Sequence, residues 1–234
     1  MPLSRKRSEA NSMRLDLYLV AYSGQLPRVQ FLGAVEAALA GGTTTVQLRS
    51  KQDASADLLD YGADIGRMSR GRQALFLVND RVDLALALGA DGAHVGQGDL
   101  PAPAARRLMP RPAILGVSAG TVEEALAAER DGADYLGVGP VFPTATKPDA
   151  GGAIGLAGLS AIAEAVRIPV VGIGGINAEN ASSVITAGAA GVAVVSAILQ
   201  SRNPEAAARE ILSRVEAAKV ERGEGPAHPG KRET

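Results

Sequence analysis

Short apolar runs rich in Val, Ile and Leu recur at regular intervals along the chain. They predict eight β-strands, at Leu15–Tyr22, Thr44–Arg49, Leu75–Asn79, Ala93–Val95, Ile114–Ser118, Tyr135–Val138, Pro169–Ile173 and Gly191–Ile198. Gly-containing turns such as Ala-Gly-Gly at 40–42 precede several of these runs, as expected where a helix ends and a strand begins.

Segments with Ala and Leu at helical spacing separate the strands. They predict helices, among them Arg28–Ala40, Ser55–Met68, Val122–Arg130, Leu159–Val166, Ala178–Ala187 and Asn203–Ala218. Strands that alternate with helices form a parallel sheet, and eight such units favour a closed barrel over an open sheet. The pattern therefore predicts an α/β fold, a single-domain (β/α)8 TIM barrel.

We expect the barrel, as the catalytic domain, to occupy residues 15–219. Residues 1–14 are basic but lead into a run that contains Asp16, unlike a signal peptide, and they predict a flexible leader. Residues 220–234 are rich in Gly, Pro and charge without periodic apolar positions, and they predict a disordered tail.

Composition removes several classes of function. The 234 residues carry 24 Lys and Arg against 25 Asp and Glu, and they include no Cys, no Trp, three Phe and four Tyr. The absence of Cys excludes disulfides, thiolate metal sites and Cys nucleophiles, and it fits a cytoplasmic protein. Balanced charge and few aromatic side chains argue against nucleic acid as a partner. No apolar run reaches the roughly 18 residues that a membrane span needs.

In a barrel of this type, chemistry lies just after the strands. After the second predicted strand, alternation places Gln47, Arg49 and Lys51 on one face. These polar groups could pair with a neighbouring acid at the surface. Burying them together is costly unless an anion or acid compensates, which favours an anion site.

Two carboxylates follow neighbouring strands. Asp80 comes after the third strand and Asp99 after the fourth, so they can share a Mg²⁺ ion that also takes diphosphate oxygens. Spacing alone leaves open that Asp80 is a helix N-cap and Asp99 a turn residue.

Other candidate groups are less specific. His94, near the end of the fourth strand, fits a hydrogen-bonded structural residue, whereas His228 falls in the predicted tail. With one usable His and no Cys, a zinc site is not supported. Ser118 ends the fifth strand without a Gly-x-Ser-x-Gly elbow; its hydroxyl suits a ligand contact or a helix cap.

The loops after the last three strands suit phosphate. The sixth strand is followed by a Gly- and Pro-rich segment with Thr144, Thr146 and Lys147. The density of hydrogen-bond donors in this segment favours a loop that binds an oxyanion over a simple connecting loop. Glycines at 172–175 and the segment after the eighth strand match the usual phosphate site of barrels. The Gly172-x-Gly174 pair is not a dinucleotide fingerprint, because the third Gly is missing.

In their order along the chain, these segments resemble the thiamine-phosphate synthase family. The resemblance runs from about Leu15 to Ile198 and rests on Gln47-Leu48-Arg49-Ser50-Lys51, Val78-Asn79-Asp80-Arg81, His94-Val95-Gly96-Gln97, Gly116-Val117-Ser118, the 137–147 segment, Gly172-Ile173-Gly174-Gly175-Ile176 and Val195-Ser196-Ala197-Ile198. It implies a transferase that condenses 4-amino-2-methyl-5-hydroxymethylpyrimidine diphosphate with 4-methyl-5-(2-hydroxyethyl)thiazole phosphate, giving thiamine phosphate and diphosphate.

The resemblance also implies roles for individual residues. The pyrimidine diphosphate would be held by Gln47, Arg49, Lys51, Asn79, Ser118 and Lys147, and the thiazole phosphate by Thr144, Thr146, Gly175, Val195 and Ser196. Asp80 and Asp99 would ligate Mg²⁺, the one cofactor implied. Lys147, Ser118 and Arg49 would contribute most to catalysis, and the partners would be small phosphorylated molecules, with a homo-oligomer compatible but no interface indicated.

Three positions depart from the family pattern: Ser50 stands where an acid is usual, Gly98 where a polar residue is frequent, and Gly120 where many relatives have His. The last bears on one alternative, a thiazole tautomerase of the same barrel type, whose catalytic His would be expected near position 120. A second alternative is a noncatalytic barrel that binds a phosphorylated ligand. The absence of that His, together with the intact loop at 144–147, favours the synthase over the tautomerase. Asp80, Asp99 and Lys147 favour it over the noncatalytic barrel, because binding a product would not need a metal directed at a diphosphate.

Overall fold

The computed structural model describes residues 13–144 and 152–224. Residues 1–12 of the predicted leader and 225–234 of the predicted tail lie outside the described residues. The range 145–151, which includes Thr146 and Lys147, also lies outside them.

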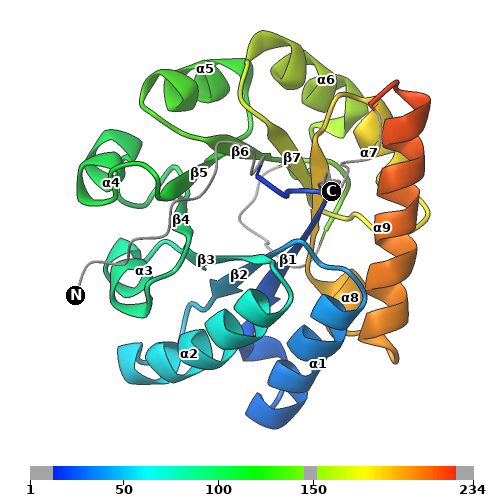
Figure 1. The fold of residues 1–234 in the computed structure, drawn as a ribbon. Helices are drawn as coiled ribbons and strands as arrows, with labels where there is room; N and C mark the ends of the chain where they lie inside the picture. Colours follow the sequence, from blue (N-terminus) through cyan, green and yellow to red (C-terminus); the bar gives the residue numbers. More distant parts are fainter. Residues whose placement is uncertain (1–12, 145–151, 225–234) are drawn as a thin grey trace, which may run out of the picture.

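Eight parallel strands close into a barrel in sequence order, with β8 pairing back onto β1 (Figure 1). The strands are β1 (Leu17–Tyr22), β2 (Thr45–Arg49), β3 (Leu75–Asn79), β4 (Gly92–Val95), β5 (Ile114–Ala119), β6 (Tyr135–Val138), β7 (Val170–Ile173) and β8 (Gly191–Val194). The predicted TIM barrel is confirmed.

Helices surround the barrel on the outside (Figure 1). They are η1 (Ser23–Gln25), α1 (Arg28–Ala40), α2 (Ser55–Gly71), α3 (Val82–Leu88), α4 (Ala102–Leu108), α5 (Val122–Arg130), α6 (Gly155–Ala165), α7 (Ala181–Thr186), α8 (Ser196–Leu199) and α9 (Pro204–Glu221). In the described ranges, none of these helices has both the length and the apolar character that a membrane crossing requires.

The prediction for the end of the last strand was wrong. The apolar run Gly191–Ile198 divides, because Val195 leaves the extended conformation (φ −121°, ψ −83°) and Ser196 begins α8. Apolar residues of a short helix and of a buried strand cannot be told apart by periodicity over so few positions. The backbone therefore turns at the residues expected to bind phosphate.

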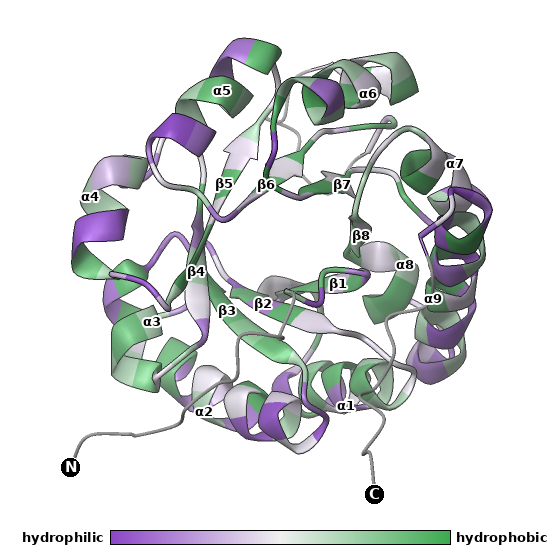
Figure 2. Ribbon diagram, turned by 45° about the horizontal axis from the view of Figure 1, so that its top comes forward, coloured by the Kyte–Doolittle hydropathy of each residue, from purple (hydrophilic) through white to green (hydrophobic). Residues whose placement is uncertain are grey.

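Two apolar cores result from the alternation along the strands. Outward residues such as Leu19, Val46 and Leu136 pack against the helices, whereas inward residues such as Leu77 and Val171 fill the barrel. Figure 2 shows that the strands are mostly hydrophobic, whereas hydrophilic residues recur on the surrounding helices. The interior is thus a packed core whose upper layers can carry polar groups.

Gly33→Ala is expected to stabilise the protein by about 0.5–1 kcal/mol, since Gly in the middle of a helix costs backbone entropy. Gly33 lies within α1, and a Cβ built there meets no atom within 4 Å. Urea unfolding followed by circular dichroism checks this. A lower free energy of unfolding in the variant would show that the position is more crowded than it appears.

Candidate active site

The predicted site residues in the described ranges gather at the carboxyl ends of the strands. Gln47, Arg49 and Asn79 lie within the last three positions of β2 and β3, and Ser118 is the penultimate residue of β5. Lys51, Asp80, Asp99, Thr144, Gly175, Val195 and Ser196 lie in or beside the loops that follow strands. Because parallel strands end at one rim, these residues share one mouth of the barrel.

The end of β2 carries an oriented cation. The guanidinium of Arg49 lies 5.2 Å from the centroid of the Tyr22 ring, in the position of a cation–π contact. The two residues are partners in the β1–β2 register. This stacking restrains the planar guanidinium at the rim, where it can meet an anion.

The loop after β2 is held by Ser50, one of the departures from the family pattern. The Ser50 hydroxyl accepts hydrogen bonds from the backbone N–H groups of Gln52 (3.2 Å) and Asp53 (3.0 Å). The Asp53 carboxylate in turn accepts from the hydroxyl of Ser23, beyond β1. Ser50 therefore shapes this loop, and the contact between Asp53 and Ser23 joins it to the segment after β1.

Asp80 adopts a backbone conformation that non-glycine residues seldom occupy. Its φ is +60°, and its N–H donates to the carbonyl of His94 at 2.8 Å. The N-cap position of α3 belongs to Arg81, so Asp80 is not the helix cap that spacing alone allowed. Residues held in such conformations cluster at functional sites, because the surroundings must compensate the strain.

Asp99 lies in the neighbouring loop after β4. One of its carboxylate oxygens accepts from the backbone N–H of Gly96 at 2.8 Å, which confirms a turn role. In the described residues no cluster of three or more His, Cys, Asp or Glu side chains could hold a metal on its own. A metal between these loops would therefore need oxygen ligands from water or substrate as well.

Ser118 is not a helix cap, because Thr121 caps α5 by accepting from the N–H of Glu124. Instead its hydroxyl lies 2.9 Å from Nε2 of His94. The carbonyl of Ser118 accepts from the side-chain amide of Gln97 at 2.7 Å. Ser118 is thus fixed from two sides while remaining partly exposed at the rim.

The loops after β6 and β7 lie against each other. The N–H of Phe142 donates to the carbonyl of Gly174 at 3.0 Å, and Gly174 and Gly175 have φ of +99° and +66°. A Cβ at Gly175 would lie 2.7 Å from the carbonyl oxygen of Pro143, one residue before Thr144. Glycine is therefore required here by both backbone conformation and close approach.

Sequence reasoning missed three tyrosines. Tyr22 stacks with Arg49, whereas Tyr18 and Tyr135 are buried inside the barrel with their hydroxyls 2.8 Å apart. The alternation along β1 already put Tyr18 and Tyr22 on the inward face, so the pattern contained this signal. Burial raises the pKa of both Tyr18 and Tyr135 above the ordinary value of 10.0.

Because of this burial, the free energy of unfolding depends on pH in the alkaline range. The folded state keeps the phenol of Tyr18 neutral whereas the unfolded state ionises it near pH 10, so stability falls as pH rises beyond about 10. Between about pH 9 and pH 11, the free energy of unfolding is expected to fall less in Tyr18→Phe than in the wild type. At pH 8 the variant is expected to be less stable than the wild type by about 1–3 kcal/mol, because the buried partners of the hydroxyl are left unpaired. Urea unfolding from pH 8 to about pH 11 measures both effects. If the free energy of unfolding fell equally with pH in the variant and the wild type, the role of Tyr18 in the pH dependence would be contradicted.

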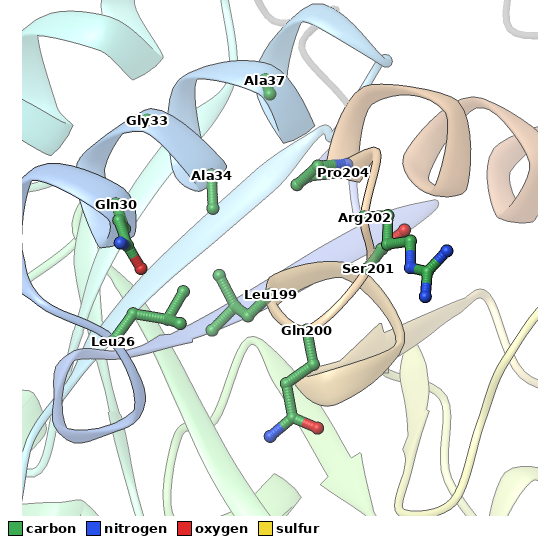
Figure 3. Close-up of a pocket in the computed structure, with 10 residues that line it drawn as sticks. All are labelled: Leu26, Gln30, Gly33, Ala34, Ala37, Leu199, Gln200, Ser201, Arg202 and Pro204. Carbon is green, nitrogen blue, oxygen red and sulfur yellow. The ribbon is translucent and has the colours of Figure 1, made fainter.

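A surface pocket lies apart from these residues, on the outer side of the barrel (Figure 3). It is lined by α1, the end of α8 and the segment that leads into α9, with Leu26, Ala34 and Leu199 among its apolar side chains. Among the predicted site residues that the structure describes, none lines it. The candidate site is therefore the rim and not this pocket.

The fold and site define a class: a (β/α)8 barrel enzyme with polar and cationic groups at the carboxyl ends of its strands. The model of the thiamine monophosphate synthase family matches residues 17–198. The chain belongs to this family, and its activity is accordingly that of a thiamine-phosphate synthase, a transferase of thiamine biosynthesis.

Individual relatives agree. A thiamine-phosphate synthase of Chloroflexus aurantiacus is 48% identical over 199 residues, covering 85% of this chain and 92% of the relative. One of Archaeoglobus fulgidus is 52% identical over 180 residues, covering 77% and 84%. A solved thiamine phosphate pyrophosphorylase from Pyrococcus furiosus has a TM-score of 0.81 at 42% identity, covering 88% of this chain and 98% of that one.

Proposed function

We propose that the rim of the barrel joins 4-amino-2-methyl-5-hydroxymethylpyrimidine diphosphate to 4-methyl-5-(2-hydroxyethyl)thiazole phosphate, with Mg²⁺ as cofactor. The observation that carries the proposal is the family match over residues 17–198, which spans every strand end that bears a candidate residue. The products are thiamine phosphate and diphosphate. We assign catalysis to the barrel of residues 15–219.

The pyrimidine diphosphate subsite consists of groups from β2, β3, β5 and the loop after β6. We assign to it Gln47, Arg49, Lys51, Asn79, Ser118 and Lys147. The charge of the cations matches that of a diphosphate, and the stacked guanidinium of Arg49 offers paired donors to its oxygens.

Asp80 and Asp99 fit a Mg²⁺ ion. Mg²⁺ in phosphoryl sites takes one or two protein carboxylates and completes its shell with substrate phosphates and water. Two aspartates on adjacent loops match that donor set, and in the described residues they are not part of a cluster of three or more His, Cys, Asp or Glu side chains. When bound, the ion supplies positive charge next to the departing diphosphate.

The thiazole phosphate subsite lies across the mouth. We assign to it Thr144, Thr146, Gly175, Val195 and Ser196, from the loops after β6, β7 and β8. Hydroxyls and backbone N–H groups there can donate to phosphate oxygens, and the positive φ of Gly175 lets the backbone approach a ligand closely.

Catalysis in this arrangement is electrostatic. The bond between the pyrimidine methylene carbon and the diphosphate oxygen breaks, and the electron pair leaves with diphosphate. Arg49, Lys51 and Lys147 neutralise the negative charge on the leaving group, and Ser118 donates a hydrogen bond to it. The aminopyrimidine spreads the positive charge on the methylene until the thiazole nitrogen supplies its lone pair to form the C–N bond. No protein nucleophile takes part.

The remaining assignments concern the setting. We place the reaction in the cytoplasm, since a chain without Cys is suited to a reducing compartment. Its partners are the two phosphorylated small molecules, without nucleic acid, and a homo-oligomer is compatible with the barrel.

An omission assay tests the function. Purified protein is incubated with both substrates and Mg²⁺, with either substrate left out, or with EDTA, and thiamine phosphate is converted to fluorescent thiochrome. We expect signal only with both substrates and Mg²⁺. Folded protein that gives no signal would contradict the proposal, and a thiazole isomerisation assay on the same preparation would then separate a tautomerase from a binding protein.

A further inference from the structure

A chain of hydrogen bonds crosses the interior of the barrel and ends at Ser118. The side-chain amide of Gln47 donates to the Tyr18 hydroxyl at 2.7 Å, and the Tyr18 hydroxyl lies 2.8 Å from that of Tyr135. The Tyr135 hydroxyl lies 2.9 Å from Nδ1 of His94, whose Nε2 lies 2.9 Å from the Ser118 hydroxyl. The five residues come from five different strands.

The packing around the chain makes room for its rings. A Cβ at Gly116 would lie 2.2 Å from the Tyr135 ring, and a Cβ at Gly137 would lie 2.9 Å from the His94 ring. Tyr135 is fully buried and His94 is 8% exposed. Two glycines on inward positions of β5 and β6 therefore hold the space in which the imidazole and the phenol meet.

The first donor sets the direction of the whole chain. The amide nitrogen of Gln47 can only donate, so the Tyr18 oxygen accepts from it. The proton of Tyr18 then points to Tyr135, whose own proton points to Nδ1 of His94. Burial raises the pKa of both tyrosines, so each phenol keeps the one proton that this sequence requires.

The reverse direction leaves a buried donor without an acceptor. If Ser118 donated to His94, then His94 would donate to Tyr135 and Tyr135 to Tyr18. The Tyr18 oxygen would accept two hydrogen bonds, from Gln47 and from Tyr135. Its own proton would then have no acceptor among the hydrogen-bond partners of Tyr18 in the described residues. Leaving such a proton unpaired in an apolar interior is unfavourable.

We propose that His94 is a positioning residue, held as the Nε2–H tautomer, which donates to the Ser118 oxygen and so leaves the Ser118 proton directed at a substrate oxygen. Ser118 then acts as a donor toward the mouth, as a negatively charged leaving group requires. The role of His94 rests on the proposed function in that Ser118 contacts the diphosphate substrate. The tautomer itself rests only on the chain of hydrogen bonds.

Nitrogen-15 NMR of histidine-labelled protein tests the tautomer without any substrate. The chain has only two histidines, so His228→Gln identifies the signals of His94. We expect a protonated, pyrrole-type Nε2 and an unprotonated, pyridine-type Nδ1. The opposite pattern would overturn the proposal, because it would mean that the Gln47 amide is rotated and the whole chain runs in reverse. An imidazolium pattern would overturn it as well.

Paired substitutions test the role in turnover. In His94→Asn the amide can reach only toward the Nδ1 position, whereas in His94→Gln it reaches toward Nε2 and can still donate to Ser118. We expect kcat to fall about 10- to 100-fold in His94→Asn and Ser118→Ala, with a smaller loss in His94→Gln and no change in KM for the thiazole phosphate. The double variant, with both His94→Asn and Ser118→Ala, should have the same kcat as Ser118→Ala alone, because the two residues act as a unit. Wild-type kcat in folded His94→Asn, or additive losses in the double variant, would overturn the proposal.

Tyr135→Phe tests the chain at a residue that substrate cannot touch. Tyr135 is fully buried, and removing its hydroxyl takes away the donor that fixes Nδ1 as an acceptor. We expect kcat to fall about 3- to 10-fold. Tyr61→Phe on α2, outside the barrel, is the matched control and keeps wild-type kcat. Equal activity of the two variants would overturn the part of the proposal that links Tyr135 to Ser118.

A wild type inactive in the omission assay would instead contradict the proposed function and leave the NMR result standing.

Discussion

Asp80→Asn is expected to lower kcat about 100-fold or more, because a metal ion beside the leaving diphosphate supplies several kcal/mol of charge stabilisation. Asn removes the negative charge of the proposed metal ligand but keeps its size, and it is among the residues that tolerate a positive φ, here +60°. The fold should therefore persist. Replacement by Ala gives the same loss of activity with an added backbone cost, which makes Asn the cleaner variant.

Asp83→Asn is the matched control for this substitution. Asp83 lies three residues further on, exposed on α3, where it forms a surface ion pair with Arg81 at 2.6 Å. Exposed pairs contribute little, so this variant should keep wild-type kcat. Steady-state kinetics across a Mg²⁺ titration compares the two. A kcat for Asp80→Asn within about twofold of wild type at saturating Mg²⁺ would remove Asp80 from the metal site.

Gly116→Ala is expected to destabilise the protein by about 3 kcal/mol, because overpacking a filled core forces rings and backbone to move. The new Cβ would lie 2.2 Å from Cζ of Tyr135 and 2.3 Å from its hydroxyl oxygen. Tyr135 is fully buried and cannot swing into solvent. For a chain of this size such a loss lowers Tm by about 6–12 °C.

Gly71→Ala is the control for the crowding at Gly116. Gly71 ends α2, and a Cβ there meets no atom within 4 Å. Thermal unfolding of both variants should show the large shift only for Gly116→Ala. A small shift would indicate that the interior of the barrel can expand around Tyr135, and the fixed geometry of the His94 chain would then be in doubt.

The sequence was sufficient to predict the barrel, because alternation of strands and helices is a property of local patterns. Leu75–Asn79, Tyr135–Val138, Arg28–Ala40 and Val122–Arg130 match the predicted bounds. The end of the last strand could not be predicted, since periodicity over so few apolar positions does not distinguish a buried strand from the start of a short helix. The conformation of Asp80 was equally hidden, because positive φ at a non-glycine residue has no signature in a single sequence.

The candidate site was predictable in its location but not in its interior. Placing chemistry after the strands located Arg49, Asp80 and Ser118 at one rim. The contacts of His94 with Tyr135 and Ser118 depend on side chains that meet across the barrel, which sequence spacing does not encode. The sequence predicted a hydrogen-bonded structural residue at His94, and its two ring nitrogens do have hydrogen-bond partners. That one of these partners is the Ser118 hydroxyl was not predicted.

The central claim is that the rim transfers the pyrimidine from diphosphate to the thiazole nitrogen. Phosphorus-31 NMR of the wild-type protein with both substrates and Mg²⁺ measures every phosphorus species in one sample. We predict that one inorganic diphosphate appears for each thiamine phosphate formed, and that none appears when the thiazole phosphate is omitted on the same time scale. Release of inorganic phosphate, or unchanged substrate signals with folded protein, would contradict the account.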